Sequence, residues 1–146
     1  MRRIYIAVAL QRAVIERAKG HCEYCHLPVA FSPNPFNFEH IIPLIKNGLT
    51  DLFNLAFSCG GCNAHKKDKI VALDPLTRQS FPLFNPRTDI WTDHFEWSED
   101  DLHVIGISPV GRATARLLKV NREGNVNLRK LLKMADLHPP VLPIKE

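Results

Sequence analysis

Two short cysteine-containing stretches decide the fold of this 146-residue chain: Cys22-Glu23-Tyr24-Cys25 and Cys59-Gly60-Gly61-Cys62. Each is a C-x2-C pair, and residues 26–58 lie between them. Four thiolates from two such pairs form the ligand set of a tetrahedral structural Zn2+ site. We therefore predict that all four cysteines bind one zinc ion. Because protein ligands would fill every coordination position, this metal would hold the fold and perform no chemistry.

Two disulfide bonds, or a redox-active C-x2-C pair, are the alternative interpretations of the cysteines. A redox pair would explain only one of the two stretches, and disulfides need an oxidising compartment. The apolar run Ile4–Leu10 could suggest a secretory leader, but Gln11-Arg12 interrupts it and no small-residue cleavage site follows. From Ala7 onward, apolar residues recur at helical spacing up to Gly20. We therefore expect an N-terminal amphipathic helix and a cytoplasmic protein.

The composition fits a single domain spanning residues 1–146. Hydrophobic residues make up 45% of the chain, which is enough for a packed core at this length. No stretch approaches the roughly 20 apolar residues of a membrane helix, so no membrane association is expected. Lys and Arg number 19 against 15 Asp and Glu, giving a net charge of +4 and a pI near 9.0. This balance slightly favours polyanionic partners, although many proteins that never bind nucleic acid share it.

The region between and after the cysteine pairs predicts two strands and a helix. Phe38–Ile42 is short, β-prone and flanked by prolines, and Leu55–Ser58 is its expected partner strand. Asn47-Gly48 supplies a turn signal between them. Asn63–Ile70 contains no Gly or Pro and directly follows the second cysteine pair, which favours a short helix. One zinc ion would thus hold a ββα unit together.

The residues around the cysteine pairs resemble the HNH endonuclease family, whose core is a ββα-metal unit. The familiar pattern is C-x2-C, then (D/E)-H-I-I-P, then N-L, then C-x2-C-(H/N)-x2-K. This chain has Glu39-His40-Ile41-Ile42-Pro43, Asn54-Leu55 and Asn63 at the matching places. The match covers residues 22–67, and the flanking regions are similar to small bacterial, particularly cyanobacterial, members of the family. One departure is Glu39, because the family usually has Asp there, so the preferred metal is less certain.

The chemistry of a nuclease can be assigned to three of these residues. A divalent cation held by oxygen ligands can neutralise the phosphoryl oxygens and stabilise the leaving oxygen. Glu39 offers a carboxylate and Asn63 an amide carbonyl, and Mg2+ (or Mn2+) accepts two such ligands together with waters. His40 is suited to activate water, because an ordinary His pKa of about 6.5 leaves the ring mostly neutral. In an ideal strand, the adjacent residues Glu39 and His40 would point to opposite faces. A site that includes both residues is therefore implied by the family resemblance and not by strand geometry.

The resemblance also implies that Asn54 supports catalysis by bonding the loop that connects the strands and holding His40 in place. Singly, each residue has an ordinary alternative: Glu39 as a surface carboxylate, His40 as a hydrogen-bonded strand residue and Asn63 as a helix N-cap. Their joint occurrence inside one zinc-held unit favours the functional interpretation. The resemblance further implies products with 5′-phosphate and 3′-hydroxyl ends.

Lys66 and Lys67 flank the Asn63 face of the expected helix, at about 300° and 400° of rotation from it. They are predicted nucleic-acid contacts, and a solvated helix face is the alternative. His65, about 200° from Asn63, points away and is not expected to bind the metal. His21 and His26 could in principle replace a cysteine, but four thiolates already suffice for zinc.

The rest of the chain predicts a further β-hairpin and two helices. Phe95 and Trp97 alternate as in a half-buried strand, with 102–107 as its partner. Core packing is the expected role of Trp91 and Trp97, although they or Arg87 could touch DNA. Ser108-Pro109 begins one helix, and a second spans 126–137. These helices carry basic residues that could either contact DNA or serve solubility: Arg112, Arg116, Lys119, Arg122, Arg129, Lys130 and Lys133.

The sequence therefore predicts an α+β protein with a zinc-stabilised ββα-metal core at about residues 20–72. An extension at about 73–146 would pack on that core. The expected function is a Mg2+- or Mn2+-dependent endonuclease acting on DNA. The alternatives are a non-catalytic zinc module that binds nucleic acid and a structural zinc protein that binds another protein.

Overall fold

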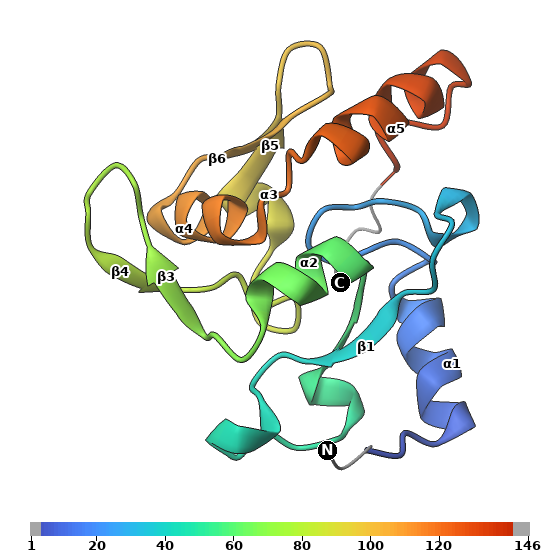
Figure 1. The fold of residues 1–146 in the computed structure, drawn as a ribbon, viewed down its shortest axis with the longest axis vertical. Coiled ribbons are helices and arrows are strands. Elements are labelled where there is room, and N and C mark those ends of the chain that lie inside the picture. The colour runs from blue at the N-terminus through green and yellow to red at the C-terminus, as the bar shows by residue number, and fades with distance from the viewer. Residues whose placement is uncertain (1–3, 142–146) are drawn as a thin grey trace.

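A computed structural model describes residues 4–141 and has a mixed α+β fold (Figure 1). Its strands form three separate two-stranded antiparallel hairpins. The helices and strands are α1 (Val8–Arg17), β1 (Asn37–His40), β2 (Leu55–Ser58), α2 (Gly60–Lys66), β3 (Val71–Leu73), β4 (Ser80–Pro82), α3 (Trp91–His94), β5 (Phe95–Trp97), β6 (Val104–Gly106), α4 (Pro109–Leu118) and α5 (Glu123–Met134). None of the helices within residues 4–141 is long and apolar enough to cross a membrane.

The first hairpin has the predicted strand pairing. β1 and β2 are antiparallel, with Glu39 opposite Ala56 and His40 opposite Leu55. β2 has the predicted bounds, whereas β1 ends two residues before the predicted Ile42. The strand stops there because the Ile42 amide donates to the Asn54 side chain, which takes the place of a partner strand. Short 3-10 turns occupy much of the connection, and Asn47, at the predicted turn, adopts a left-handed conformation.

Helix α2 begins earlier than predicted, at Gly60, and ends at Lys66. Cys59 is its N-cap, because the Cys59 Sγ accepts the Cys62 amide. Asn63 therefore lies inside the helix, and the alternative that it caps the helix is wrong. The chain leaves the helix at Lys67, whose φ of 54° and ψ of −130° are not helical.

Helix α1 confirms the predicted N-terminal helix, and Gly20, at φ +70°, follows its end as expected. Val14 is its fully buried residue. Arg17, at its last turn, donates to the carbonyls of Leu52 and Leu55 at 2.5 and 2.6 Å. Helix α1 is thereby attached to the start of β2.

The extension contains the predicted hairpin, β5–β6, and the two predicted helices, α4 and α5. Ser108 caps α4 through its hydroxyl, as Ser108-Pro109 indicated. Helix α5 begins at Glu123, three residues before the predicted start. The sequence analysis did not predict the hairpin β3–β4. Asp74 closes it by accepting hydrogen bonds from the amides of Leu76 and Thr77 and, through both carboxylate oxygens, from Nε and Nη2 of Arg112.

One cluster of buried side chains joins the first hairpin to the extension. The Trp91 indole donates to the Tyr24 carbonyl at 3.0 Å, and its ring stacks 4.2 Å from the His26 ring. Phe84 packs edge-on against Tyr24 and Phe95. The tryptophans therefore have the packing role that the sequence favoured.

Candidate metal centre and active site

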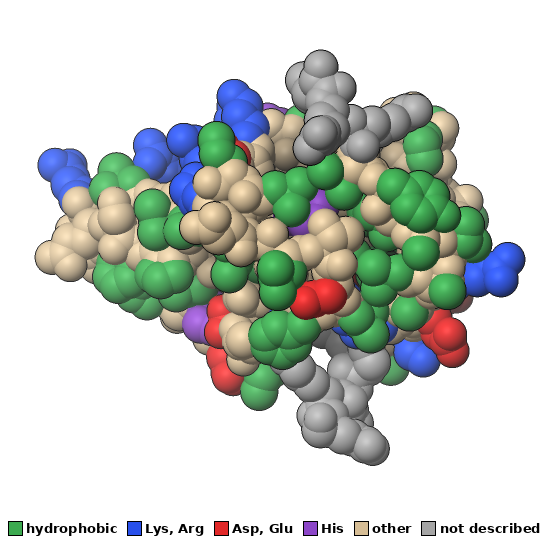
Figure 2. Space-filling view, turned by 90° about the horizontal axis from the view of Figure 1, so that it is seen from below, with side chains coloured by type: hydrophobic (Ala, Val, Ile, Leu, Met, Phe, Trp, Pro, Cys, Tyr) green, Lys and Arg blue, Asp and Glu red, His purple; other side chains and the backbone are tan. Residues whose placement is uncertain are grey.

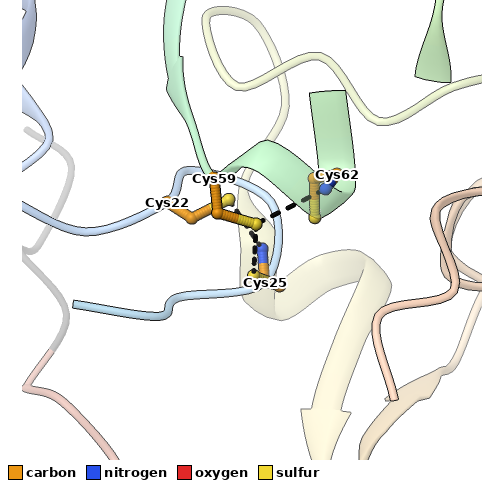
Figure 3. Close-up of side chains that lie close together, drawn as sticks. All are labelled: Cys22, Cys25, Cys59 and Cys62. Atoms are coloured by element: carbon orange, nitrogen blue, oxygen red, sulfur yellow. Dashed lines mark hydrogen bonds between the residues drawn. The ribbon is translucent and has the colours of Figure 1, made fainter. Parts of the chain in front are cut away.

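The four cysteines meet at one buried point (Figure 3). Cys22 and Cys25 lie on the turn after α1, Cys59 follows β2, and Cys62 lies in α2. Their sulfur atoms are all within 4.8 Å of one another, and those of Cys25 and Cys59 are 3.6 Å apart. Ligands of a tetrahedral zinc ion with bonds near 2.3 Å lie about 3.8 Å apart. The cysteines are free thiols rather than disulfides, and their arrangement is consistent with a zinc site.

The electrostatics of the cluster favour a bound cation. Burial raises the pKa of Cys22 well above its ordinary value. Hydrogen bonds from the other thiols, that of Cys22 first, lower the pKa of Cys59. The contacts among the four cysteines thus favour a thiolate on Cys59 over one on Cys22. A divalent cation at the centre would deprotonate the whole set, because metal-bound thiols ionise outright.

The Glu39 carboxylate lies inside the first hairpin, only 6% exposed. The Tyr24 hydroxyl donates to its Oε2 at 2.8 Å, and the Lys66 ammonium lies 2.5 Å from its Oε1. Burial raises the pKa of Glu39, and the charge of Lys66 opposes that rise. Since Tyr24 sits between Cys22 and Cys25, the first cysteine pair also positions this carboxylate.

The solvent-facing position predicted for Lys66 is wrong. Lys66 is 2% exposed, and its Nζ also donates to the Ile41 carbonyl at 3.0 Å. The helical rotation correctly placed it near the Asn63 face, but that face covers β1 instead of meeting solvent. Lys66 is therefore a buried partner of Glu39, out of reach of a nucleic acid. Lys67, one residue further, is exposed as predicted.

His40 is the last residue of β1 and is partly buried. Its Nε2 lies 2.8 Å from the Thr50 hydroxyl, a contact that the sequence analysis did not assign. Burial, and then the nearby charge of Lys66, lower the pKa of His40 below its ordinary value. The imidazole is thus kept neutral at neutral pH. Thr50 lies in an irregular loop, where spacing gives no signal of the contact.

Asn54 holds the loop that connects β1 to β2. Its Oδ1 accepts the Ile42 amide at 2.9 Å, and its Nδ2 donates to the carbonyls of Ile42 and Leu49 at 2.9 and 2.8 Å. Gly48 is required beside it, because a Cβ there would lie 1.7 Å from the Ile42 oxygen. The loop therefore closes tightly after His40, in keeping with the supporting role that the resemblance implied for Asn54.

Glu39, His40 and Asn63 border the same hollow, which we call the β1–α2 hollow. Its volume is about 460 Å3, and Lys67, Ile6 and Ile45 also line it. His65 is not part of it, because its Nδ1 lies 2.7 Å from the Gly61 carbonyl oxygen. A second hollow of about 650 Å3 lies between the end of α1 and residues 84–92, and it includes none of the predicted catalytic residues.

Exposed hydrophobic side chains surround this part of the molecule (Figure 2). The view looks onto the end where Figure 1 shows the start of the chain and the β1–β2 connection, and Lys and Arg lie at its margins. Within the connection, Ile45, Leu49 and Phe53 are the most exposed apolar residues. Lys46 beside them is exposed and donates to the Asp68 carbonyl.

Comparison with known families agrees with this geometry. Residues 22–69 match the family described as HNH endonuclease. Neither the curated proteins nor the solved structures gave a match. The matched region contains both cysteine pairs, the first hairpin and α2, and therefore every residue of the predicted site. We call this matched segment, residues 22–69, the HNH domain; the family's description implies nuclease activity, phosphodiester hydrolysis and a nucleic-acid substrate for its members.

Proposed function

We propose that this protein is a metal-dependent endonuclease that hydrolyses phosphodiester bonds in DNA. The observation that carries the proposal is the grouping of Glu39, His40 and Asn63 around one hollow next to the four-cysteine cluster. A carboxylate, an amide oxygen and a neutral imidazole are the groups that metal-assisted hydrolysis of a phosphodiester requires.

Glu39 and Asn63 would hold the catalytic Mg2+ or Mn2+. Both offer hard oxygen donors to the β1–α2 hollow, which suits these cations. The Glu39 Oε1 is buried and has no well-aligned hydrogen bond among the described residues, although the Lys66 ammonium is 2.5 Å away. At this distance the positive charge of Lys66 favours the ionised carboxylate and opposes the effect of burial on the Glu39 pKa. When bound, the cation would neutralise the phosphoryl oxygens and the leaving oxygen.

His40 would act as the general base. In the tautomer in which Nε2–H donates to the Thr50 hydroxyl, Nδ1 is the nitrogen that accepts a proton from water. Asn54 would hold the ring in place through the loop, and Lys67 would contact a phosphate at the edge of the hollow. The pKa of His40, lowered by burial and by Lys66, favours the neutral form that this role needs.

The contacts of the basic residues give less support to a non-catalytic nucleic-acid-binding module. Four of the seven basic residues named for the two helices are engaged within the protein, and the exposed Lys133 is one of them, because it donates to the Asp100 carbonyl. Arg112 pairs with Asp74, Arg122 donates to Cys59 and to two carbonyls, and Arg129 is fully buried. Arg116, Lys119 and Lys130 are exposed. The basic charge of the extension is thus largely structural, and the grouping in the β1–α2 hollow would have no purpose without catalysis.

A plasmid-nicking assay tests the proposal. The zinc-loaded protein should nick plasmid DNA with Mg2+ or Mn2+ and be inactive in EDTA at a concentration that leaves zinc bound. His40→Ala should lower the rate by about 10²–10⁴-fold, the usual contribution of a general base, with unchanged zinc content and melting temperature. His103→Ala, in the β5–β6 turn, is the control and should stay active.

Two results would contradict the proposal. DNA binding without cleavage in either metal would favour the non-catalytic module, and full activity of His40→Ala would remove His40 from the base role. An RNA of the same sequence, tested in parallel, checks the preference for DNA.

A further inference from the structure

Arg122, in the short connection between α4 and α5, reaches the cysteine cluster from outside the HNH domain. Its Nη2 donates to the Cys59 sulfur at 3.5 Å. Its Nη1 donates to the carbonyls of Leu118 and Lys119 at 2.7 and 3.0 Å, which fixes the guanidinium at the end of α4. Helix α4 lies against α2, which carries Cys62 (Figure 1). The extension therefore presents a fixed positive group to a cysteine of the cluster.

The charge of a four-thiolate zinc site explains why a cation is needed there. Four thiolates and one Zn2+ carry a net charge of −2, and all four cysteines are buried. Burying uncompensated charge is costly. Arg129 supplies a second positive charge nearby: it is fully buried, and its guanidinium lies 5.3 Å from the centre of the Trp97 ring. The two arginines together match the charge of the site.

The pKa directions of the arginines agree with this arrangement. Burial lowers the pKa of Arg122, but the charges of Cys62, Cys25 and Cys59 raise it more, so its net direction is upward. Burial lowers the pKa of Arg129, and the charges of Cys25 and Cys62 oppose that change. The charges of the cluster thus act to raise the pKa of both guanidinium groups, against the effect of burial.

Gly61 shows how closely the guanidinium approaches. A Cβ at this position would lie 2.4 Å from Arg122 Cζ and 2.4 Å from its Nη2, and the three nearest atoms all belong to that guanidinium. At the neighbouring Gly60, a Cβ would meet nothing within 4 Å. The absence of a side chain at 61 therefore makes room for the arginine.

We propose that Arg122 is a positioning residue of the zinc site, which holds the Cys59 thiolate and compensates the negative charge of the Zn(Cys)4 centre. The extension is then a functional part of that site: it contributes a hydrogen bond from α4–α5 to a metal ligand in the HNH domain. Groups of this kind, which contact a metal ligand, typically change metal affinity by about 10–100-fold when removed. The proposal is independent of the catalytic roles of Glu39, His40 and Asn63.

Zinc affinity of the full-length protein, measured by competition with a chromogenic chelator, tests the proposal. Arg122→Gln should weaken zinc binding by about 10–100-fold. Arg116→Gln, an exposed arginine of α4, removes the same charge away from the cluster and should bind zinc like the wild type. Retention of wild-type zinc affinity by Arg122→Gln would overturn the proposal.

A pair of glycine variants separates the contact with zinc ligands from the role of Arg122 at the end of α4. Gly61→Ala displaces the guanidinium and keeps its charge, whereas Gly60→Ala fills open space in the same helical turn. Ala favours a helix over Gly by about 1 kcal/mol, so helix propensity alone would make neither variant bind zinc more weakly. We expect Gly61→Ala alone to lose zinc affinity. Equal affinities of the two variants would overturn the proposal, even if Arg122→Gln binds zinc weakly or fails to fold.

Cobalt substitution provides a spectroscopic signal that a purely structural role of Arg122 would not change. With Co2+ in the cysteine site, loss of a hydrogen bond to a thiolate should shift the sulfur-to-cobalt charge-transfer band. We expect that shift in Gly61→Ala and none in Gly60→Ala. An identical spectrum in both variants would count against a direct contact with the ligand.

Discussion

The HNH domain and the extension contribute different groups to the interior that they share. Residues 22–69 bury polar and charged groups, among them the four cysteines, Glu39 and Lys66. The extension buries polar groups as well, Asp74 and Arg129 among them, but its centre is a set of packed aromatic rings, with Trp91 lying 5.1 Å from Phe95 and 5.6 Å from Trp97 between ring centres. A polar interior folds only if every charge finds a partner, whereas an aromatic one needs only to exclude water.

This difference explains why the two regions occur together. A segment as short as residues 22–69 buries too little apolar surface to fold alone, and small domains commonly depend on a metal for this reason. The extension adds apolar cover, since Trp91 packs on His26 and bonds the Tyr24 carbonyl. Zinc binding and aromatic packing should therefore stabilise the two regions as one cooperative folding unit.

The largest expected effect follows removal of a cysteine. Cys59→Ser should lose zinc and unfold, because structural zinc contributes about 10–16 kcal/mol in small zinc domains, as much as the whole stability of many proteins. Ala64→Ser, at an exposed position of α2, adds a hydroxyl without touching the cluster and is the control. Zinc content and thermal melting are the measurements.

The same variant tests whether the regions are coupled. Both tryptophans of the chain, Trp91 and Trp97, lie in the extension, so tryptophan fluorescence reports on that region and on its contact with His26. We expect the emission of Cys59→Ser to resemble that of unfolded protein. A native tryptophan spectrum in a zinc-free variant would instead divide the chain into two independent domains.

The next largest effect is expected from removing a buried aromatic ring of the extension. Trp91→Ala should lower the free energy of unfolding by about 3–5 kcal/mol, the usual cost of removing a large buried ring. Urea unfolding followed by circular dichroism measures it, and Met134→Ala, at an exposed position, is the control. A loss below 1 kcal/mol, about that of an ordinary surface change, would mean that the ring does not bridge the regions.

Local patterns in the sequence were sufficient for much of the HNH domain. The bounds of β2 and the meeting of the two cysteine pairs follow from short motifs with fixed spacing, whereas a site shared by Glu39, His40 and Asn63 was implied by the family resemblance alone. In each case the informative residues are close in the chain, or a metal site requires them to converge.

The missed features depend on packing between distant elements. Helical rotation placed Lys66 beside Asn63, but only the position of β1 makes that face buried. β3 and β4 have three residues each, so their alternation of exposed and partly buried residues is too short to give a strand signal. Arg122 was one basic residue among seven, and the cysteine it contacts is 63 residues away. No local pattern encodes such contacts.

The smallest predicted effect concerns His26, which lies where the two regions meet. It is buried, and its Nδ1 has no hydrogen-bond partner among residues 4–141. Burial lowers its pKa from 6.5 to about 3, with further contributions from the charges of His21, Arg129 and His138. Below pH 6.5 His26 therefore binds a proton in the unfolded chain, whereas in the folded protein it binds one only near pH 3. Stability should fall as pH falls across this interval, by at most about 1.4 kcal/mol per pH unit from this residue.

His26→Phe keeps a ring against Trp91 and removes the titration, so its unfolding free energy should fall less steeply with acid than that of the wild type. Protonation of the zinc-binding cysteines also destabilises both proteins in acid, but it is common to the two and cancels in the comparison of slopes. Urea unfolding at half-unit steps from about pH 4.5 to 6.5 measures the difference, since the linkage applies between the two pKa values. Parallel slopes would show that the interface between HNH domain and extension opens enough for the ring to be protonated in the folded state, and the two regions would then be less tightly joined than their contacts indicate.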